Sequence, residues 1–249
     1  MRHEPKIEPW PKDFSGKLPL IELFYSIQGE GRFAGCPAVF IRLRYCNLGC
    51  AWCDTRFTWE SGNIEEGELL TAEEIAAKAA EAVSSSGADP SGIHAVITGG
   101  EPMLHQDRLP ELIEQLRARG FEFIEIETNG MFVPDERLVR AVSWWNCSPK
   151  LSNNGLEASA NVVPAALKAI AVTNRADFKF VVRSQEEIAE IESDYLPYIG
   201  KDQVMLMPEG WSREKQLRAM PWIIEECARR GFRFSPRLHI LAWNNERAR

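Results

Sequence analysis

No stretch of this 249-residue chain approaches the roughly 18 consecutive apolar residues that a membrane-spanning helix requires. Residues 1–16 are polar and rich in proline, without the apolar core of a secretory signal. We therefore expect a cytoplasmic protein that does not contact a membrane. Internal repeats and low-complexity tracts are absent as well, which favours one compact domain.

Basic residues are too few for broad binding to nucleic acid. The 29 lysines and arginines face 36 acidic residues, and the net charge of −7 disfavours extended contact with a phosphate backbone. A chain of this length buries about 70–75% of its unfolded surface and needs no disulfide bonds. In a reducing compartment, cysteines are expected to bind a metal or to take part in catalysis rather than to form disulfides, whereas the isolated Cys36, Cys147 and Cys227 are expected to have a packing or incidental role.

Strand and helix patterns alternate along the chain after a proline-rich, irregular arm over residues 1–17. β-Branched and aromatic residues predict strands over 21–27, 38–45, 93–98, 121–127, 143–147, 177–182 and 203–207. Apolar residues at helical spacing predict helices over 71–83, 109–120, 135–142, 164–170, 184–194 and 212–230. This order predicts an α/β domain over residues 18–249, with a parallel sheet or an incomplete barrel and functional residues at the carboxyl ends of the strands.

Local signals add detail to this prediction. Two helices begin with the residues of a capping box: Thr71 with Glu74, and Ser184 with Glu187. Pro221 falls inside the last predicted helix, where it would introduce a kink. Residues 57–67 are predicted as an acidic loop, and residues 232–243 as a partly extended end of the domain.

Three cysteines in one loop, directly after a predicted strand, are the most informative feature. Cys46, Cys50 and Cys53 have the spacing C-x3-C-x2-C, and thiolates select zinc or an iron–sulfur cluster. A closed zinc site needs a fourth ligand, which Cys36 or Cys147 would supply only if the fold brought one of them close. With three thiolates a [4Fe–4S] cluster keeps one iron open to a small molecule, whereas ferredoxins use four cysteines.

Other motifs follow the next predicted strands. Thr98-Gly99-Gly100-Glu101-Pro102 combines glycines, which permit close backbone approach, with carbonyls and a carboxylate that suit a cationic amine. Asn129-Gly130 is a turn sequence at the end of the next strand. Ser148-Pro149-Lys150 brings an ammonium group to the strand after that. Each motif by itself is also compatible with an ordinary turn or loop.

Together these motifs resemble the radical S-adenosylmethionine superfamily. In that superfamily the open iron binds the amino and carboxylate groups of S-adenosylmethionine, and an electron from the cluster cleaves it to give a radical that abstracts a substrate hydrogen. Three further segments narrow the resemblance to the 7-carboxy-7-deazaguanine synthase family: Phe24-Tyr25-Ser26-Ile27-Gln28-Gly29-Glu30-Gly31, Cys53-Asp54-Thr55 and Leu238-His239-Ile240-Leu241. The resemblance extends over residues 19–243 and implies an incomplete α/β barrel of the radical S-adenosylmethionine type.

The resemblance implies a reaction. Enzymes of that family convert 6-carboxy-5,6,7,8-tetrahydropterin to 7-carboxy-7-deazaguanine with loss of ammonia, on the route to queuosine and related deazapurines. The hydrogen abstracted at C6 is later returned, so that S-adenosylmethionine is regenerated. The resemblance also implies a requirement for Mg²⁺, a homodimer and an electron donor such as a flavodoxin.

The resemblance assigns roles to individual residues. The cluster would be held by Cys46, Cys50 and Cys53, and Mg²⁺ by Thr55. S-adenosylmethionine would be contacted by Trp52, Cys53, Asp54, Gly100, Ser148, Pro149 and Lys150. The pterin would be contacted by Ile27, Gln28, Gly29, Arg42, Thr98 and His239. The chemistry of these residues agrees, since the planar fork of Arg42 matches the substrate carboxylate, and Gln28 has both donors and acceptors for a pterin edge.

Two other functions remain open from the sequence. A radical enzyme that acts on a protein, such as a glycyl-radical activase, would share the cysteine loop but would not need Gln28, Arg42 or His239. An electron carrier or a zinc module would bind metal without radical chemistry. The resemblance explains neither the arm over residues 1–17 nor the long segment over residues 151–163.

Overall fold

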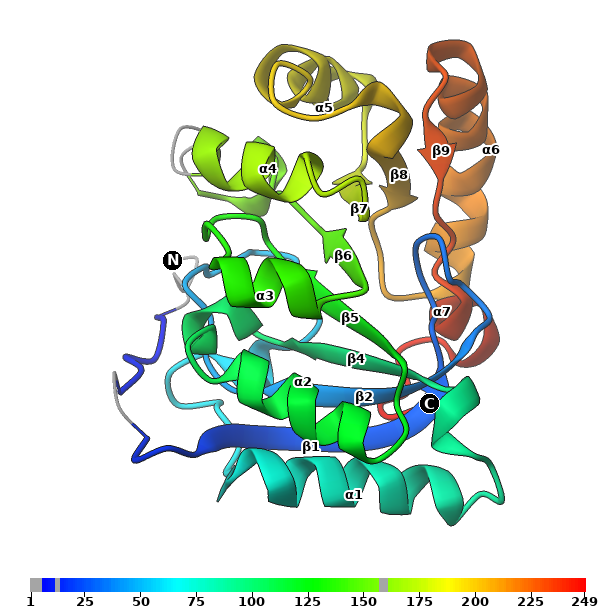
Figure 1. Cartoon of the computed structure of the whole chain (residues 1–249). Coiled ribbons are helices and arrows are strands. Elements are labelled where there is room, and N and C mark those ends of the chain that lie inside the picture. The colour runs from blue at the N-terminus through cyan, green and yellow to red at the C-terminus, as the bar shows by residue number, and fades with distance from the viewer. Residues whose placement is uncertain (1–5, 12–13, 157–160) are drawn as a thin grey trace. The chain divides into compact units, whose positions relative to one another are not determined.

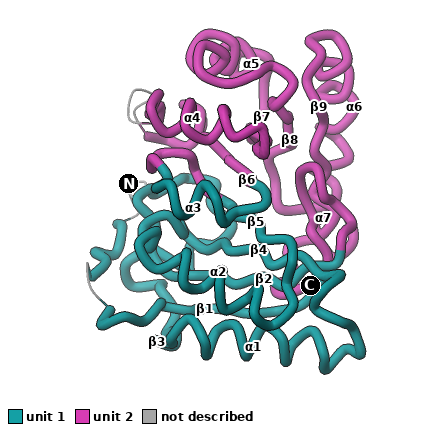
Figure 2. The backbone as a smooth tube through the Cα atoms, in the orientation of Figure 1, with its two compact units in different colours: residues 1–26, 37–127, 134–144 teal, residues 27–36, 128–133, 145–249 magenta. Residues whose placement is uncertain are grey.

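A computed structural model describes residues 6–11, 14–156 and 161–249. The chain forms two compact units, coloured separately in Figure 2. Unit 1 comprises Met1–Ser26, Pro37–Glu127 and Pro134–Trp144, and unit 2 comprises Ile27–Cys36, Thr128–Val133 and Trp145–Arg249. Parts of the predicted arm and of segment 151–163 lie outside the described residues. In the described ranges, no helix is long and apolar enough to cross a membrane.

Unit 1 is built on strands in the order β3-β1-β2-β4-β5. Their bounds are Leu18–Ile27 for β1, Pro37–Leu43 for β2, Glu68–Leu70 for β3, His94–Gly99 for β4 and Phe123–Thr128 for β5. The last residue of β1 and of β5 belongs to unit 2. β2, β4 and β5 are parallel (Figure 1), whereas β3 is antiparallel to β1. The helices are α1 (Ala72–Ser84), α2 (Leu109–Ala118) and α3 (Glu136–Ala141).

Unit 2 contains the parallel strands β6-β7-β8-β9, in that order, except for the first residue of β6, which belongs to unit 1. Their bounds are Trp144–Cys147, Ala176–Val182, Val204–Pro208 and Arg233–Phe234. The helices are α4 (Pro164–Ala171), α5 (Gln185–Glu190), α6 (Arg213–Arg230) and α7 (Leu238–Trp243). A π-helical turn over Ile191–Tyr195 extends α5. Short 3-10 turns in the two units cover Arg56–Thr58, Pro90–Gly92, Pro102–His105, Ser152–Asn154 and Lys201–Gln203.

Apolar periodicity explains why these elements form and pack. In β4, the consecutive residues Ala95, Val96 and Ile97 are all fully buried, as expected for a parallel strand covered on both faces. Helix α1 buries Ile75, Ala79 and the other apolar residues of one face, and it packs against α2 (Figure 1). The carboxyl ends of β2 and β4 are therefore held in fixed register, with Arg42 beside Thr98.

The structure confirms most predicted elements and corrects four details. The capping box predicted at Ser184 is wrong, because the Glu187 carboxylate accepts the backbone N–H and the side chain of Arg183 instead. The sequence reasoning missed β3, which has only three residues, and placed no helix in the last segment, where α7 forms. The segment over residues 57–67, predicted as a loop, begins within the 3-10 turn Arg56–Thr58. The box at Thr71 and Glu74 is present, with both of its hydrogen bonds.

The Thr71 cap gives a first prediction. Replacing Thr71 with alanine removes the acceptor for the Glu74 N–H and should lower the free energy of unfolding by about 1 kcal/mol. Urea denaturation followed by circular dichroism measures the change. Ser85→Ala, at the exposed C-terminal cap of the same helix, is the matched control and should have little effect. Equal losses in the two variants would contradict the assignment.

Candidate active site

The cysteine loop begins where β2 ends. Tyr45 adopts a positive φ of 74°, which turns the chain out of the strand, and its N–H donates to the Thr58 carbonyl at 2.8 Å. Cys46 and Cys50 are buried, whereas Cys53 is partly exposed. The Cys53 N–H donates to the Cys50 carbonyl at 3.2 Å and closes a turn between the second and third cysteines. The loop thus carries its three thiols at the carboxyl end of a core strand of unit 1.

Several N–H groups are directed at the sulfur atoms of this loop. The Leu48 N–H donates to Cys46 Sγ at 3.4 Å, the Thr55 N–H to Cys53 Sγ at 3.4 Å, and the Trp59 indole N–H to Cys53 Sγ at 3.2 Å. Burial, followed by the nearby Glu101 carboxylate, raises the pKa of the Cys46 thiol far above its ordinary value, and Cys50 and Cys53 add to the effect. A buried thiolate beside like charges requires a compensating cation.

These residues fit an iron–sulfur cluster by their chemistry. Soft thiolates bind iron, and N–H donors to ligating sulfur are a usual part of such sites. Among the described residues, no three His, Cys, Asp or Glu side chains are grouped as a finished metal site. The fit therefore rests on the donor set and on the N–H groups directed at sulfur.

The paired glycines at the end of β4 allow the loop to lie where it does. A Cβ atom on Gly99 would lie 2.2 Å from the Leu43 carbonyl oxygen, and one on Gly100 would lie 2.2 Å from the Tyr45 carbonyl oxygen. The Gly100 N–H donates to Leu43 and the Glu101 N–H to Tyr45, at 3.1 and 2.8 Å. Gly100, predicted as a cofactor contact, therefore also has a packing role that excludes any side chain.

The predicted substrate residues of unit 1 lie side by side. Arg42 and Thr98 are register partners on β2 and β4, so their side chains share one face of the sheet. The Arg42 guanidinium Nε lies 2.8 Å from a Glu22 carboxylate oxygen, and both side chains are largely buried. Thr55 lies close to the third cysteine, with its hydroxyl oxygen 3.5 Å from Cys53 Sγ. Of the two other predicted residues in the loop, Trp52 is half-buried and Asp54 is exposed.

Unit 2 brings together two predicted residues that are distant in sequence. Gly29 and His239 are in contact: a Cβ atom at position 29 would lie 2.1 Å from His239 Nδ1, and the Leu238 N–H donates to the Gly29 carbonyl at 2.8 Å. Gln28 is buried, and its N–H donates to the Cys36 carbonyl at 2.7 Å, which closes the loop over residues 28–36. Ile27, just before this loop, is half-buried.

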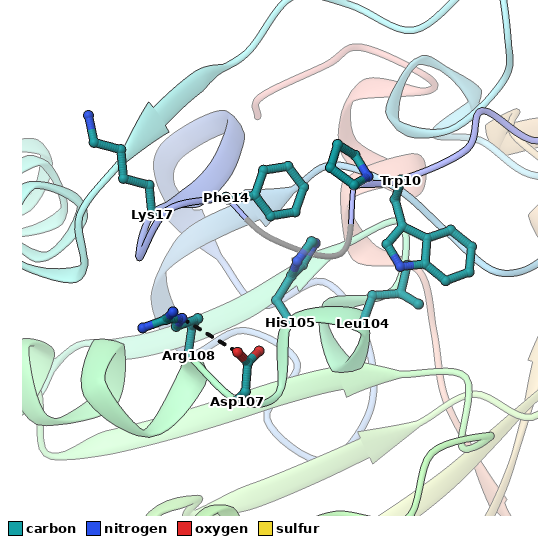
Figure 3. A pocket seen from close by; sticks show the side chains of 8 residues that line it. Trp10, Phe14, Lys17, Leu104, His105, Asp107 and Arg108 are labelled. Carbon is teal, nitrogen blue, oxygen red and sulfur yellow. Dashed lines mark ion pairs between the residues drawn. The ribbon is translucent and has the colours of Figure 1, made fainter.

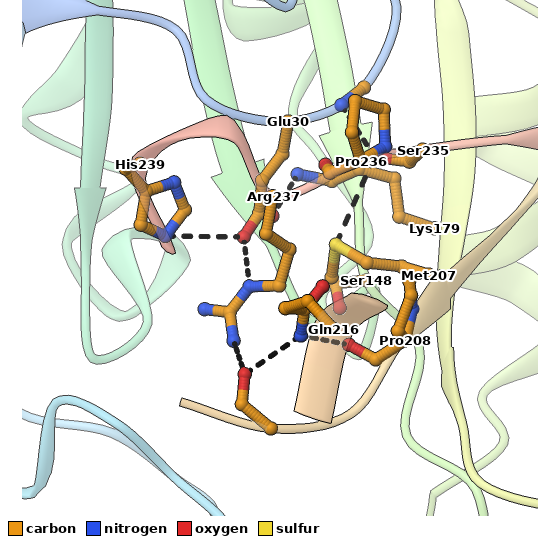
Figure 4. Close-up of polar contacts among 12 residues, drawn as sticks. Glu30, Ser148, Lys179, Met207, Pro208, Gln216, Ser235, Pro236, Arg237 and His239 are labelled. Atoms are coloured by element: carbon orange, nitrogen blue, oxygen red, sulfur yellow. Dashed lines mark hydrogen bonds and ion pairs between the residues drawn. The ribbon is translucent and has the colours of Figure 1, made fainter. Parts of the chain in front are cut away.

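Glu30, in this loop, is the centre of a largely buried charge cluster (Figure 4). One carboxylate oxygen lies 3.0 Å from Lys179 Nζ, and the other lies 2.8 Å from Arg237 Nε and 3.9 Å from His239 Nε2. Burial alone would raise the pKa of Glu30, but Lys179, Arg237 and His239 outweigh it and hold that pKa far below its ordinary value. Arg237 also donates to the Gly210 carbonyl at 3.1 Å.

A second charge cluster holds the same loop from the neighbouring position on β7. Asp177, which is fully buried, accepts Arg32 Nε at 3.0 Å and Arg233 Nη1 at 2.7 Å. Sequence reasoning missed both clusters. The available signal was the pair of charged residues Asp177 and Lys179, two positions apart in an otherwise apolar strand.

The segment after β6 contains the remaining predicted cofactor residues. The Ser148 N–H donates to the Thr128 carbonyl at 2.7 Å, and Lys150 Nζ lies 2.9 Å from the Ser148 hydroxyl. The Tyr195 hydroxyl donates to the Lys150 carbonyl at 2.6 Å, and Pro149 is buried. This segment is therefore held by backbone and side-chain contacts within unit 2.

The described part of the arm packs onto the rest of unit 1. Phe14 places its ring 5.9 Å from that of Tyr45 and 5.5 Å from that of His105. Burial lowers the pKa of His105, whose Nε2 lies 3.0 Å from the Arg44 carbonyl. Trp10 and Phe14 line a pocket of about 140 Å³ on this side of the unit (Figure 3). The arm thus contacts Tyr45, the residue that directly precedes the first cysteine.

Comparison with known proteins agrees with this geometry. The Radical SAM superfamily model matches residues 40–143. A 7-carboxy-7-deazaguanine synthase from Pyrobaculum aerophilum is 40% identical over 94% of this chain and 98% of that protein. The chain belongs to the 7-carboxy-7-deazaguanine synthase family. A relative of the same name from Halobacterium salinarum is 34% identical over 92% of this chain and 91% of that protein.

Solved structures give the fold of the family. The crystal structure of QueE from Escherichia coli has a TM-score of 0.68 and 30% identity, and the match covers 90% of this chain and 95% of that one. Native anSMEcpe with bound AdoMet, at 13% identity and a TM-score of 0.52 over 76% of this chain and 61% of that one, is similar in fold alone. The predicted fold class, an incomplete α/β barrel of the radical SAM type, is confirmed. Membership of this synthase family argues against the alternative functions that the sequence left open, namely a zinc module, an electron carrier and a glycyl-radical activase.

Gly100 gives a second prediction. Gly100→Ala should displace the cysteine loop from its position against the end of β4, because the added methyl group would overlap the Tyr45 carbonyl oxygen. After anaerobic reconstitution, we expect the variant to bind much less iron and sulfide per chain than the parent protein. Gly92→Ala, where a Cβ atom would meet open space, should bind the same amount as the parent. Full iron content in Gly100→Ala would contradict the role assigned to this glycine.

Glu30 gives a third prediction, on pH dependence. Its lowered pKa means that the folded state keeps Glu30 ionised while the unfolded chain takes up a proton below an ordinary pKa of about 4.3. Its contribution to stability is therefore complete at neutral pH and declines as the pH falls below about 5. Glu30→Gln should cost about 3–5 kcal/mol at pH 7 by removing the carboxylate with which the buried Lys179 and Arg237 pair, and the deficit should shrink towards pH 3. Urea titrations at several pH values measure it, and a deficit that grows with acidification would contradict the assignment.

Proposed function

We propose that this chain is a radical S-adenosylmethionine enzyme that converts 6-carboxy-5,6,7,8-tetrahydropterin into 7-carboxy-7-deazaguanine, with loss of ammonia. The observation that carries the proposal is the 40% identity, over nearly the full length of both chains, to a protein named 7-carboxy-7-deazaguanine synthase. The enzyme would act in the cytoplasm on the route to queuosine or a related deazapurine.

The cysteine loop supports the cofactor part of the proposal. Cys46, Cys50 and Cys53 would hold a [4Fe–4S] cluster, with Leu48, Thr55 and Trp59 donating N–H groups to the sulfurs. When bound, the cluster and S-adenosylmethionine supply a one-electron cleavage that yields a radical for hydrogen abstraction. S-adenosylmethionine would be contacted by Trp52, Cys53, Asp54, Gly100 and Ser148-Pro149-Lys150. The Lys150 ammonium, held against the Ser148 hydroxyl, would face its anionic carboxylate.

Charge and hydrogen-bonding capacity support the substrate part of the proposal. Arg42 has Glu22 as its one ion-pair partner in the described residues, and this contact fixes the plane of a guanidinium that would bind the pterin carboxylate. Thr98 lies beside it and would contact the same substrate. Gln28, together with Ile27, Gly29 and His239, would contact the pterin ring.

The remaining parts of the proposal concern a metal ion and partners. The Thr55 hydroxyl would supply one oxygen ligand to Mg²⁺, which accepts few protein ligands and otherwise keeps water or substrate oxygens. We expect a flavodoxin-type electron donor and a homodimer. The net charge of −7 supports action on a free small molecule rather than on nucleic acid.

The experiment is an anaerobic assay of the reconstituted protein. Substrate, S-adenosylmethionine, Mg²⁺ and dithionite should give 7-carboxy-7-deazaguanine by mass spectrometry, with less S-adenosylmethionine consumed than product formed. Omission of Mg²⁺ should slow turnover. Absence of product from a protein with a full cluster, or a protein that binds zinc and no iron, would refute the proposal.

His239 gives the fourth prediction and tests the substrate site. His239→Ala should raise KM for the pterin about tenfold, the equivalent of about 1.4 kcal/mol of lost binding, while reductive cleavage of S-adenosylmethionine without pterin stays unchanged. The matched control is Trp243→Ala, which truncates a partly exposed residue at the end of the same helix α7. If KM is unaffected in His239→Ala, a different radical reaction becomes the better interpretation.

A further inference from the structure

We propose that Trp59, held in place by the N-terminal arm, is a positioning residue for the iron–sulfur cluster. Its indole N–H hydrogen bond to the Cys53 sulfur raises the reduction potential of the cluster and slows the loss of iron. This inference rests on the proposed function in one respect, namely that Cys46, Cys50 and Cys53 bind the cluster.

The central observation is the contact between Trp59 and Cys53. The indole Nε1 lies 3.2 Å from Cys53 Sγ, within the distance of an N–H···S hydrogen bond. The Trp59 side chain is 1% exposed and is among the largest fully buried side chains of the described chain. Since indole is a donor only, this geometry presents a fixed donor to whatever charge the sulfur carries.

The arm holds the backbone of Trp59 from one side. Ile7 and Glu60 form an antiparallel bridge, in which the Glu8 N–H donates to the Trp59 carbonyl and the Ser61 N–H donates to the Lys6 carbonyl, both at 2.8 Å. The packing extends to the cysteine loop itself, because a Cβ atom on Gly49 would lie 3.5 Å from the Trp59 ring and 3.6 Å from Ile7. Arm, indole and cysteine loop are therefore in mutual contact.

The cysteine loop holds Trp59 from the other side. The Trp59 N–H donates to the Arg56 carbonyl at 3.0 Å, and the preceding Thr58 accepts the Tyr45 N–H at 2.8 Å through its carbonyl. The Thr58 hydroxyl donates to the Thr55 carbonyl at 2.8 Å. The indole is thus fixed relative to both ends of the loop, and its N–H has little freedom to leave the sulfur.

The direction of the effect follows from charge. Reduction adds one electron to the cluster and its thiolates, and an N–H donor stabilises the more negative state. Loss of the donor therefore makes the cluster harder to reduce. The Thr55 N–H, which also donates to Cys53 Sγ, remains in place and keeps the thiolate partly compensated.

The experiment compares two replacements at position 59 in the reconstituted full-length protein. One is Trp59→Phe; the other replaces Trp59 by β-(3-benzothienyl)alanine, which keeps the bicyclic shape and exchanges only the N–H for sulfur. Redox titration followed by electron paramagnetic resonance should give a more negative midpoint potential in both. Iron release to a chelator should be at least about tenfold faster. Trp243→Phe, at a partly exposed tryptophan, is the matched control and should match the parent in both measurements.

The contribution of the arm is tested by a matched pair at position 8. Glu8→Pro removes the N–H that donates to the Trp59 carbonyl, whereas Glu8→Ala removes the side chain and keeps the N–H. Glu8→Pro should shift the potential and the iron release in the same direction as Trp59→Phe, and Glu8→Ala should change neither. Equal behaviour of the two variants would overturn the role of the arm.

The outcomes separate this inference from the proposed function. A benzothienyl variant with full iron content and an unchanged midpoint potential overturns the role of the N–H, even if Trp59→Phe fails to fold. A parent protein that assembles no cluster refutes the proposed function instead. A parent protein that assembles a cluster and forms the deazapurine, with all variants unchanged, refutes the inference alone.

Discussion

The close approach of the β4 end to the β2 end is the contact on which the cysteine loop depends. Gly99 and Gly100 lie against the carbonyl groups of Leu43 and Tyr45, at a separation that leaves no space for a Cβ atom. Backbone hydrogen bonds at this contact fix where β2 ends and where the cysteine loop, with Cys46, begins. The arrangement of three thiols, and the chemistry that they permit, is therefore set by main-chain geometry before any side chain contributes.

In unit 2, largely buried ion pairs hold a loop in place, as backbone contacts do for the cysteine loop of unit 1. The loop over residues 28–36 has few apolar side chains with which to pack, and ion pairs from Glu30 and Arg32 to β7 and the C-terminal segment hold it instead. Because an unpaired charge in such a place is costly, each partner constrains the others. Gln28 and Gly29 thus occupy a loop whose position is defined by charge rather than by secondary structure.

The sequence predicted best what depends on nearby residues. The capping box at Thr71 needs only Glu74, three positions away, and it forms as predicted. The box at Ser184 failed because Arg183, a neighbour outside the pattern, competes for the Glu187 carboxylate. Short elements such as β3 have too few residues to show a period.

The sequence predicted the motif residues of the candidate site but not the residues that hold them in place. The cysteine loop and the residues at the strand ends can be identified from their spacing and from their resemblance to a family. The partners of Glu30 do not, because they lie 149 and 207 residues away along the chain and no local pattern connects them. The role of Trp59 likewise follows only from the structure, which places its indole N–H beside the Cys53 sulfur.

The two charge clusters of unit 2 also have an effect beyond their hydrogen bonds. Four cationic side chains, Arg32, Lys179, Arg233 and Arg237, face two carboxylates, Glu30 and Asp177. Each carboxylate pairs with two of these cations, in a protein whose overall charge is −7. Because ion pairs that are removed from water are screened much less by salt than exposed pairs, the position of this loop should change little as ionic strength rises.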